Sequence, residues 1–422
     1  MKHIVIIGAG FAGLKLARQL NNNKHYKITL IDKNNYHQFQ PLLYQVATAN
    51  LDASNVSFPL RTIFKHSKNV SVRITSLVSI NTVENTILTD TGTIAFDYLV
   101  LATGADTNFF GNEELSKNAF PMKNTLEALQ LRNQIIQNLE SASICAQEEE
   151  LKRLLTIVVV GGGPTGIELS GALAEIKHEK LPGEYPELNI QKVKIYLLEA
   201  SPGLLSAMRP RSSRRSEEYL KNMGVIVKTN TMLKSYDGKN VLLNSGETIP
   251  SALVIWAAGI KGNIPPGIEQ TLIAPGNRIL VDTLNRVQGF THIFALGDVA
   301  FMSTEVHPKG YPQLASVAID QAKNLADNFN KILENKPLKP YLFVNKGNMA
   351  TIGKNKAVVD LEIPKWSLGG FFAWFIWMSL HLFLLIGFKN RIVVFIHWVY
   401  KYVMRTQSLS LLFEPLLRKK NG

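Results

Sequence analysis

The sequence predicts an α/β protein with two Rossmann-like dinucleotide-binding domains and a C-terminal amphipathic helical region. Residues 3–20 and 157–176 each begin with an apolar β-branched run, turn through closely spaced glycines and continue with a helical pattern. Each is followed by a second apolar strand that ends in an acidic residue. Alternating strand and helix signals predict right-handed βαβ units and parallel sheets. The last observation is a stretch without Lys, Arg, Asp or Glu at residues 366–388.

The first glycine turn is Gly8-x-Gly10-x-x-Gly13, placed between a strand and a helix. The first glycine permits the tight turn, the second lets the backbone approach a pyrophosphate, and the third allows close helix–strand packing. The N-terminus of the helix then faces the negative charge. Asp32 lies 19 residues after Gly13, where a carboxylate can accept from a ribose hydroxyl. Together these features indicate a nucleotide site.

The second glycine turn is Gly161-x-Gly163-x-x-Gly166, and it repeats the same arrangement. Its acid, Glu199, follows Gly166 by 33 residues, because residues 178–190 form a polar insertion that is predicted to be a loop. A carboxylate at this position would repel a 2′-phosphate. The second site is therefore predicted to prefer NADH over NADPH.

Two nucleotide sites in one chain predict a flavin and a nicotinamide, between which hydride passes when the two rings are stacked. The strands at 98–104 and 253–259 end in small residues, and they are similar to the ATG-type strands that mark lobe crossings in two-dinucleotide flavoproteins. Residues 293–298 resemble the second flavin fingerprint of that superfamily, whose Asp, here Asp298, binds the ribityl chain. The expected domains are FAD-binding parts at 1–118 and 281–340, an inserted NADH-binding domain at 119–280 and a membrane-anchoring region at 341–422.

Composition excludes several other classes of protein. The net charge is +13, but no nucleic-acid module or basic stripe interleaved with aromatics accompanies it. Cys145 is the single cysteine, which excludes a disulfide framework, a cysteine-rich metal site and an intramolecular dithiol. The histidines lack the spacing of metal ligands, so no metal is expected. The N-terminal apolar run leads directly into the glycine turn rather than resembling a signal peptide, so a cytosolic N-terminus is expected.

A narrower resemblance runs over nearly the whole chain. Residues 35–48 (NYHQFQPLLYQVAT), 161–171 (GGGPTGIELSG) and 381–391 (HLFLLIGFKNR) are similar to the corresponding segments of type II NADH dehydrogenases. This family is single-subunit, contains FAD, reduces quinone and pumps no protons. The resemblance implies non-covalent FAD, NADH as substrate and a quinone as acceptor. It also implies a catalytic role for Glu168, in the first turn of the second helix, in positioning and in supplying protons for quinone reduction. A helix-start acid that only stabilises the helix dipole is the alternative.

The expected site residues follow from the motifs and the resemblance together. The FAD set comprises Gly8, Ala9, Gly10, Phe11, Ala12, Gly13, Asp32, Lys33, Ala102, Thr103, Gly104, Gly297 and Asp298. The NADH set comprises Gly161, Gly163, Pro164, Thr165, Gly166, Glu168, Glu199, Ala258 and Gly259. The quinone set comprises Gln45, Gln313, Ala315, Ser316, Ala318 and Asp320.

One segment departs from the family pattern. The family usually carries Ala-Gln-x-Ala-x-Gln near the quinone, whereas residues 315–320 read Ala-Ser-Val-Ala-Ile-Asp. Gln313 and Gln321 lie nearby but out of register, and one residue turns a helical side chain by roughly 100°. Asp320 is therefore expected to place a charge near the quinone headgroup and to affect the choice or affinity of quinone.

The C-terminal region is expected to contact a membrane. Residues 366–388 are long enough to cross a bilayer as one helix, but the family resemblance favours a monotopic anchor of two interfacial helices. A buried core or dimer helix pair is the third interpretation, and a homodimer is expected from the family. From Lys389 onward there are seven Lys or Arg residues and one acid, Glu414, which favours anionic lipid. The predicted location is the cytoplasmic face of the cell membrane.

Two alternatives to this function remain open from the sequence. The first is a related flavoprotein with a different electron acceptor, such as a ferredoxin-type partner, for which the apolar tail would be unnecessary. The second is a non-catalytic NADH-sensing flavoprotein, which the replacements at Ser316 and Asp320 leave open. Steady-state NADH oxidation with and without quinone distinguishes these alternatives.

Overall fold

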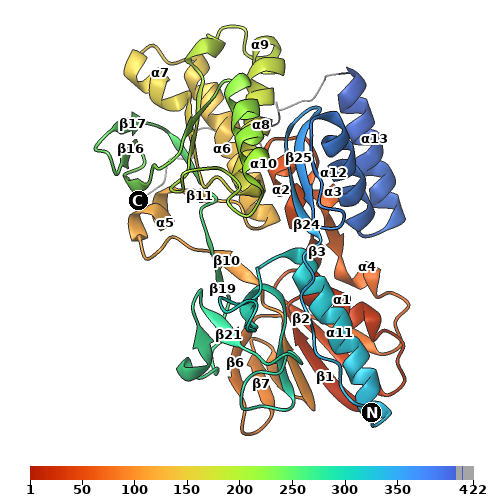
Figure 1. Ribbon diagram of the computed structural model, residues 1–422. Helices are drawn as coiled ribbons and strands as arrows, with labels where there is room; N and C mark the ends of the chain where they lie inside the picture. The colour runs from red at the N-terminus through yellow and green to blue at the C-terminus, as the bar shows by residue number, and fades with distance from the viewer. Residues whose placement is uncertain (405–410, 412–422) are drawn as a thin grey trace. The chain divides into compact units, whose positions relative to one another are not determined.

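The computed structural model describes residues 1–404 and residue 411. The chain forms two compact units, each assembled from separate segments (Figure 1). Unit 1 comprises Met1–Gln38, Phe58–Asp106 and Ile260–Val344, and unit 2 comprises Phe39–Ser57, Thr107–Gly259 and Asn345–Gly422. The chain passes between the units five times, and two of these passages lie at β10 (Ala105–Thr107) and β19 (Ile260–Gly262). The domain boundaries after residues 118, 280 and 340 stay predictions.

Unit 1 is built on a five-stranded sheet in the order β22-β9-β1-β2-β5. Its strands are β22 (Ile293–Ala295), β9 (Tyr98–Leu101), β1 (Lys2–Ile7), β2 (Tyr26–Asp32) and β5 (Val70–Ile74). Every pairing in it is parallel. The predicted parallel βαβ organisation is therefore confirmed here, and the carboxyl ends of β1, β2 and β9 meet at one edge, as ligand sites in open α/β sheets require.

Helices α1 (Phe11–Gln19) and α11 (Ala315–Leu333) lie side by side in unit 1 (Figure 1). Each has a buried apolar face, which α1 forms with Leu14, Leu16 and Ala17. Unit 1 also contains two small sheets. One is formed by β6 (Leu77–Asn81), β7 (Thr86–Thr89) and β8 (Gly92–Ala95). The other is formed by β20 (Ile273–Ala274), β21 (Arg278–Leu280) and β23 (Ala300–Phe301). Buried residues of all three sheets form one hydrophobic core.

Unit 2 repeats the architecture with a five-stranded parallel sheet in the order β11-β18-β12-β13-β14. Its strands are β11 (Phe120–Pro121), β18 (Leu253–Trp256), β12 (Thr156–Val160), β13 (Lys194–Leu198) and β14 (Val225–Lys228). An antiparallel sheet of β15 (Leu233–Tyr236), β16 (Asn240–Leu243) and β17 (Thr248–Pro250) shares its core. The duplication seen in the sequence is thus a duplication of the fold.

The helices of unit 2 correct one prediction. Residues 178–190 are not a continuous loop, because α8 (Pro164–Glu179) extends into the segment and α9 (Leu181–Glu184) follows. The start of the insertion is helical because it continues α8 to Glu179, and α9 then packs against α8. The other helices are α2 (Leu43–Ala47), α3 (Ala53–Val56), α5 (Glu113–Asn118), α6 (Thr125–Ser143), α7 (Glu148–Leu154) and α10 (Pro210–Asn222). Shorter elements elsewhere are β3 (Tyr36–Gln38), β4 (Ser57–Pro59) and α4 (Leu60–Ile63).

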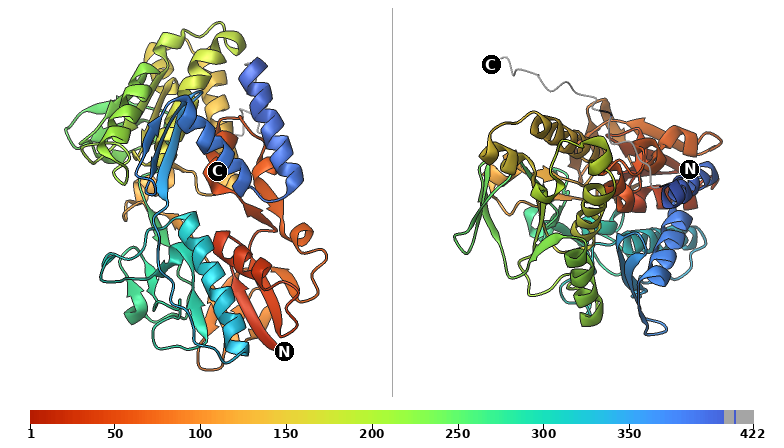
Figure 2. Two further views of the ribbon diagram at one scale, coloured as in Figure 1. Left: turned by 45° about the vertical axis from the view of Figure 1, so that its right-hand side comes forward. Right: turned by 90° about the horizontal axis from the view of Figure 1, so that it is seen from above.

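The C-terminal region forms an antiparallel sheet, β24 (Gly347–Gly353), β25 (Lys356–Leu361) and β26 (Ser367–Gly369), followed by α12 (Phe371–Leu384) and α13 (Phe388–Met404). The two blue helices pack on one another, and α12 also contacts β25 (Figure 2). Sheet and helices belong to unit 2, where β24 packs along α8.

The apolar stretch at residues 366–388 is not one helix, so the bilayer-crossing interpretation of it is wrong. Helix α12 has 14 residues, its cap residue Leu385 has an extended ψ of 142°, and Gly387 has a φ of +82° before α13 begins. In the part of the chain that the structure describes, no helix combines the length and the apolar character needed to span a membrane. Of the predicted basic tail, Arg405, Arg418, Lys419 and Lys420, together with the acid Glu414, lie outside the described residues.

Candidate functional site

The first glycine turn joins β1 to α1 at the carboxyl edge of the unit 1 sheet. Gly8 has a φ of +100°, and a Cβ there would lie 2.3 Å from the carbonyl oxygen of Ala102, so only glycine fits. A Cβ on Gly13 would lie 1.9 Å from the carbonyl oxygen of Gly8, which explains the close approach of helix and strand. A Cβ on Gly10 would meet no described atom within 4 Å. The turn therefore leaves room at the helix N-terminus for a phosphate group.

Asp32 lies at the end of β2 beside this turn. Its Oδ2 accepts from the backbone N–H of Ala9 at 2.7 Å, and its Oδ1 accepts from the N–H of Asn34 at 2.8 Å. Burial raises the pKa of Asp32, and the two backbone N–H groups oppose that rise. A carboxylate oxygen has two lone pairs, so each one retains the capacity to accept from a ribose hydroxyl. These residues fit the adenosine and pyrophosphate part of a dinucleotide.

The second glycine turn, between β12 and α8, has the same geometry. Gly161 has a φ of +113°, and a Cβ there would lie 2.6 Å from the carbonyl oxygen of Ala257. The Oε2 of Glu199 accepts from the N–H of Gly162 at 2.5 Å, and its Oε1 accepts from the N–H of Ser201 at 2.7 Å. Glu199 thus holds its glycine turn as Asp32 holds the first, although 33 residues rather than 19 separate acid and turn.

The small residues at the strand ends allow backbones to approach the turns. Ala102 follows β9 and faces Gly8. Ala258 follows β18 and faces Gly161, because a Cβ built on Gly161 would lie only 2.9 Å from the Cα of Ala258. Gly259 faces an aromatic ring instead, because a Cβ there would lie 2.8 Å from the Cζ of Phe110. A larger residue at 259 would therefore have to displace the exposed ring of Phe110.

The segment with the predicted flavin carboxylate, Asp298, forms a 3₁₀ turn that packs against α11. Gly297 has a φ of +72°, and a Cβ there would lie 3.1 Å from the Cβ of Ala318, so both positions must be small. The N–H of Gly297 donates to the Oε1 of Gln321 at 2.8 Å, and the Nε2 of Gln313 donates to the carbonyl oxygen of Asp298 at 2.9 Å. The two glutamines near the altered motif therefore hold this turn.

The predicted quinone residues divide between the two units. Gln45 belongs to α2 in unit 2, whereas Gln313, Ala315, Ser316, Ala318 and Asp320 belong to unit 1. Ser316 is exposed at the start of α11, and Asp320 forms an ion pair of 3.1 Å with Lys323. The charge of Asp320 is thus partly balanced within its own helix.

Glu168 occupies the most perturbed environment of any carboxyl group in the described chain. It lies in the first turns of α8, and its side chain is buried. Its Oε1 accepts from the indole Nε1 of Trp377 at 3.1 Å and from the backbone N–H of Thr351 at 3.4 Å. Burial raises the pKa of Glu168 to about 8, although both hydrogen bonds oppose that rise. The carboxyl group is therefore predominantly protonated at neutral pH.

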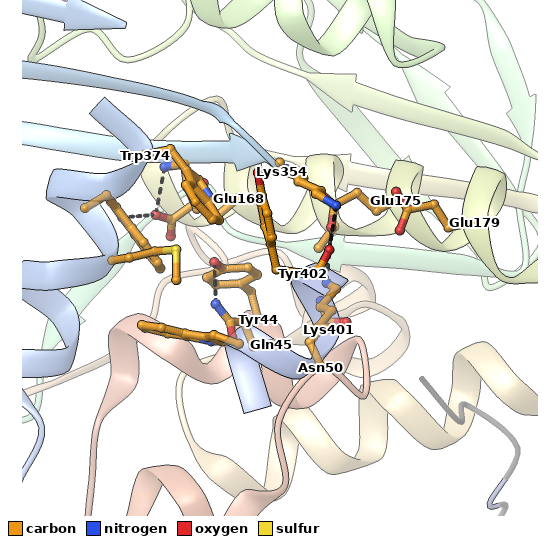
Figure 3. A pocket seen from close by; sticks show the side chains of 16 residues that line it. Tyr44, Gln45, Asn50, Glu168, Glu175, Glu179, Lys354, Trp374, Lys401 and Tyr402 are labelled. Atoms are coloured by element: carbon orange, nitrogen blue, oxygen red, sulfur yellow. Dashed lines mark hydrogen bonds and ion pairs between the residues drawn. The ribbon is translucent and has the colours of Figure 1, made fainter. Parts of the chain in front are cut away.

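A pocket opens beside Glu168 in unit 2 (Figure 3). Its empty volume is about 680 Å³, including the part that is open to solvent. Its inner wall is aromatic, and Glu175, Lys354 and Lys401 line the other end. Residues from α2, α8, β24, α12 and α13 all contribute. The lining residues are Tyr44, Gln45, Asn50, Glu168, Ala172, Glu175, Glu179, Thr351, Gly353, Lys354, Trp374, Trp377, Met378, Trp398, Lys401 and Tyr402.

Gln45 belongs to a hydrogen-bonded chain on the wall of this pocket. The Nε1 of Trp398 donates to the Oε1 of Gln45 at 2.9 Å, and the Nε2 of Gln45 donates to the hydroxyl oxygen of Tyr44 at 2.9 Å. Burial, and secondarily the Glu168 carboxylate, raises the pKa of Tyr44 well above its ordinary value, so this phenol remains neutral. The pocket therefore combines flat apolar walls with polar groups, as sites for small planar ligands do.

Sequence reasoning missed Tyr44, Trp377 and Trp398. Tyr44 directly precedes Gln45 in the segment that resembles the family, and that adjacency was an available signal. The tryptophans stand in uniformly apolar runs, where nothing in the sequence separates a lipid-facing indole from a hydrogen-bonded one. His381, the one titratable residue in the 366–388 stretch, is buried and stacks on Trp377 with a centroid distance of 3.9 Å.

Comparisons with known protein families cover almost the whole chain. The family model of pyridine nucleotide-disulphide oxidoreductases matches residues 2–322, and the model of the NDH2 C-terminal domain matches residues 345–406. The type II NADH:quinone oxidoreductase NdhA of Mycobacterium tuberculosis is 34% identical over 96% of this chain and 88% of its own length. The type II NADH:quinone oxidoreductase of Haemophilus influenzae is 29% identical, over 90% and 93%.

Solved structures share the fold. The NDH2 of Plasmodium falciparum in complex with NADH superposes with a TM-score of 0.87 at 22% identity, covering 95% of this chain and 98% of that one. The sulfide:quinone oxidoreductase of Aquifex aeolicus has a TM-score of 0.72 at 21% identity, covering 96% of each chain. The predicted fold class, two Rossmann-like domains with a C-terminal region, is confirmed.

Proposed function

The chain belongs to the family of type II NADH:quinone oxidoreductases, and we propose that it oxidises NADH with FAD and reduces a quinone at the pocket beside Glu168. When bound by the residues assigned below, FAD would supply the acceptor for the hydride of NADH. The polypeptide binds and orients the reactants and moves protons. A dithiol route is excluded because the chain has one cysteine, Cys145.

We assign the dinucleotides by the two glycine turns. The proposed FAD residues are the set from Gly8 to Gly13 with Asp32, Lys33, Ala102, Thr103, Gly104, Gly297 and Asp298. The proposed NADH residues are Gly161, Gly163, Pro164, Thr165 and Gly166 of the glycine turn, together with Glu168, Glu199, Ala258 and Gly259. The Glu199 carboxylate supports NADH over NADPH, because a 2′-phosphate beside it would meet a like charge.

The observation that carries the quinone assignment is a neutral carboxylic acid that lines an aromatic pocket. Reduction of a quinone to a quinol takes up two protons as well as two electrons, so a proton donor must lie within reach. With a pKa of about 8, Glu168 holds a transferable proton at neutral pH, which suits a general acid. Trp374, Trp398 and Tyr402 offer flat faces against which a planar ring can pack.

We assign Gln45 to the quinone site with Glu168, since both line the pocket. Gln313, Ala315, Ser316, Ala318 and Asp320 belong to unit 1, and their part in quinone binding stays a prediction from the family resemblance. In place of the glutamines of the usual family motif, Ser316 offers a hydroxyl group and Asp320 a carboxylate already paired with Lys323. We therefore expect these two residues to tune the affinity for quinone rather than to abolish turnover.

We further propose that α12 and α13 attach the enzyme to the cytoplasmic face of the cell membrane. Both helices expose large apolar side chains, namely Phe371, Phe372, Phe375, Leu380, Phe383, Leu384, Phe388, Ile392, Phe395, Ile396, Val399, Tyr400, Tyr402 and Val403. Such a concentration on two adjacent helices supports a lipid-facing surface. Lys389 and Arg391, at the start of α13, support contact with anionic headgroups. A homodimer is proposed from the family alone.

The proposed function is tested with Glu168→Gln, which preserves the shape of the side chain and removes its acidic proton. We expect the variant to bind FAD and its flavin to be reduced by NADH in the absence of quinone, at a rate that is recorded separately because Glu168 also belongs to the proposed NADH set. Its reoxidation by menaquinone or ubiquinone analogues should slow about 100-fold, the lower range for loss of a general acid. Stopped-flow absorbance of the flavin measures both steps. The control is Glu149→Gln, an exposed change on α7. Wild-type reoxidation of Glu168→Gln would refute the assignment.

A further inference from the structure

Both hydrogen bonds to the Glu168 carboxyl group end on the same oxygen atom. The Nε1 of Trp377 and the backbone N–H of Thr351 donate to Oε1, from α12 and β24 respectively. We propose that Trp377 is a positioning residue that makes Oε1 the accepting oxygen, so that Oε2 carries the proton delivered to the quinone. This inference rests on the proposed function of Glu168 as the proton donor.

The choice of oxygen follows from hydrogen-bond chemistry. A protonated carboxyl group has one carbonyl oxygen, which is a good acceptor, and one hydroxyl oxygen, which donates. Two N–H donors on Oε1 favour the form in which Oε1 is the carbonyl oxygen. The proton then resides on Oε2, the oxygen that neither donor occupies. Glu168 lines the pocket, so this orientation makes the hydroxyl group available to a ligand (Figure 3).

Trp377 itself is held rigidly by its neighbours. Its side chain is 2% exposed, and its indole stacks on the His381 imidazole with ring planes 22° apart. The carbonyl oxygen of Trp377 can only accept, so the Nδ1 of His381, 2.8 Å away, must carry a hydrogen and donate to it. The ring of Tyr44 packs edge-on against the indole from α2. The indole N–H is therefore aimed at Glu168 before any ligand binds.

The same N–H group acts on the product of proton transfer. In that step the Oε2–H bond of Glu168 breaks and an O–H bond forms on one quinone oxygen, while the two electrons come from NADH oxidation. The second proton of the quinol is taken from water. The negative charge left on the carboxylate is then shared with Oε1, where hydrogen bonds from Trp377 and Thr351 become charge-assisted and stronger. Trp377 thus stabilises the product of proton transfer more than the starting acid, which favours the transfer.

Other titratable groups border the same pocket and must be considered in any pH profile. They are Tyr44 on α2, Glu175 and Glu179 on α8, Lys354 between β24 and β25, and Lys401 and Tyr402 on α13. His381 on α12 does not line the pocket but stacks on Trp377. Burial lowers the pKa of His381 to about 4, so it is neutral throughout the alkaline range. Lys401 pairs with Glu175 at 3.3 Å. Groups that titrate equally in two variants cancel when the variants are compared.

The experiment compares Trp377→Phe with Trp398→Phe in the full-length, FAD-loaded protein. Each change removes one indole N–H donor on the wall of the pocket, but only Trp377 donates to Glu168, whereas Trp398 donates to Gln45. The direct readout is the infrared C=O stretch of the protonated Glu168 carboxyl group, identified as the band that Glu168→Gln removes. Its intensity is followed from pH 6 to pH 10. The kinetic readout is the alkaline decline of kcat for quinone reduction.

We expect Trp377→Phe to raise the midpoint of the infrared band by about one pH unit and to lower kcat about tenfold, as loss of one hydrogen bond to a charged group predicts. The alkaline decline of kcat should move upward with the band, because Glu168 must be protonated to act. Trp398→Phe should leave the band's midpoint unchanged. Replacing Trp377 by β-(3-benzothienyl)alanine, which keeps the bicyclic shape but has sulfur in place of N–H, should reproduce the Phe result and thereby exclude a packing effect.

An unchanged midpoint in Trp377→Phe, or an equal shift in Trp398→Phe, would overturn the role of Trp377 while leaving Glu168 as proton donor. Conversely, wild-type quinone turnover by Glu168→Gln would overturn the proposed function, even if the infrared band still shifted in Trp377→Phe. The two failures therefore produce different patterns. In Trp377→Phe and Trp398→Phe, neither of which belongs to the proposed FAD or NADH set, reduction of the flavin by NADH without quinone should proceed at the wild-type rate, which verifies that the protein is folded.

Discussion

Replacing Glu168 by glutamine should make the protein more stable, by an amount that grows with pH. A buried carboxyl group whose pKa is raised from 4.5 to about 8 binds its proton more tightly in the folded protein than in the unfolded chain. Below pH 4.5 both states are protonated and the group has no effect. Between pH 4.5 and pH 8 only the folded state keeps the proton, so the stability of the wild type falls as pH rises. Above pH 8 the loss is complete.

The size of the effect follows from this difference in pKa. At 1.36 kcal/mol per pH unit, the full loss amounts to roughly 5 kcal/mol above pH 8, and the part expressed at pH 7 is roughly 3 kcal/mol. Glutamine does not titrate, and its amide oxygen can still accept from Trp377 and Thr351. Glu168→Gln should therefore match the wild type near pH 5 and exceed its stability by roughly 3 kcal/mol at pH 7.

The assay is urea unfolding of the FAD-loaded protein in detergent at pH 5, 6, 7 and 8, followed by tryptophan fluorescence. The quantity compared is the difference in unfolding free energy between Glu168→Gln and the wild type. Other buried groups, such as His37, whose pKa burial lowers to about 4, contribute equally to both proteins and cancel. A difference that stays constant from pH 5 to pH 8 would show that Glu168 is not a buried acid with a raised pKa.

Two further predictions concern packing and the membrane. Gly171→Ala places a Cβ 1.7 Å from the carbonyl oxygen of Ile352, so β24 must shift. We expect the free energy of unfolding, measured by urea denaturation, to fall by about 2 kcal/mol. We also expect quinone reduction, measured by stopped-flow absorbance, to be at least tenfold slower. Wild-type values for both would contradict the packing argument. The double change of Phe372 and Phe383 to Ser, which are 73% and 70% exposed, should release the protein from anionic vesicles in a flotation assay. The control is Val83→Ser, which removes an apolar side chain that is 90% exposed in unit 1 and should leave vesicle binding intact. Unchanged flotation of the double variant would exclude these phenylalanines from the lipid contact.

The dinucleotide turns could be predicted because their determinants are local. Gly8 and Gly161 have positive φ angles, and the acids at Asp32 and Glu199 close onto turns that directly follow the neighbouring strand. Strand, turn, helix and acid all fall within one short unit of sequence, so spacing alone predicts their proximity. Even the longer interval before Glu199 did not obscure the pattern, although part of the insertion proved helical rather than a loop.

The proton site could be predicted only in part, because its partners are distant in the chain. Glu168 and Trp377 are 209 positions apart, and Gln45 and Trp398 are 353 positions apart. Uniformly apolar residues around the tryptophans also conceal which face of each helix is buried. The same uniformity made residues 366–388 resemble a single long helix, although the chain breaks at Leu385 and Gly387. Only tertiary packing shows which helix faces are buried and where the apolar stretch is broken.

Helix α8 explains why the acid and the nucleotide turn are found on one element. Gly166 packs its first turn onto the glycine loop, and Gly171, five residues later, lets the backbone of β24 come close enough for Thr351 to donate to Glu168. A buried carboxylic acid with a raised pKa lowers stability at neutral pH, and selection for stability alone would remove it. Glycine at position 171, by contrast, is required by the close approach of β24. The acid on this tightly packed part of α8 is the expected mark of a site where stability has been exchanged for proton transfer.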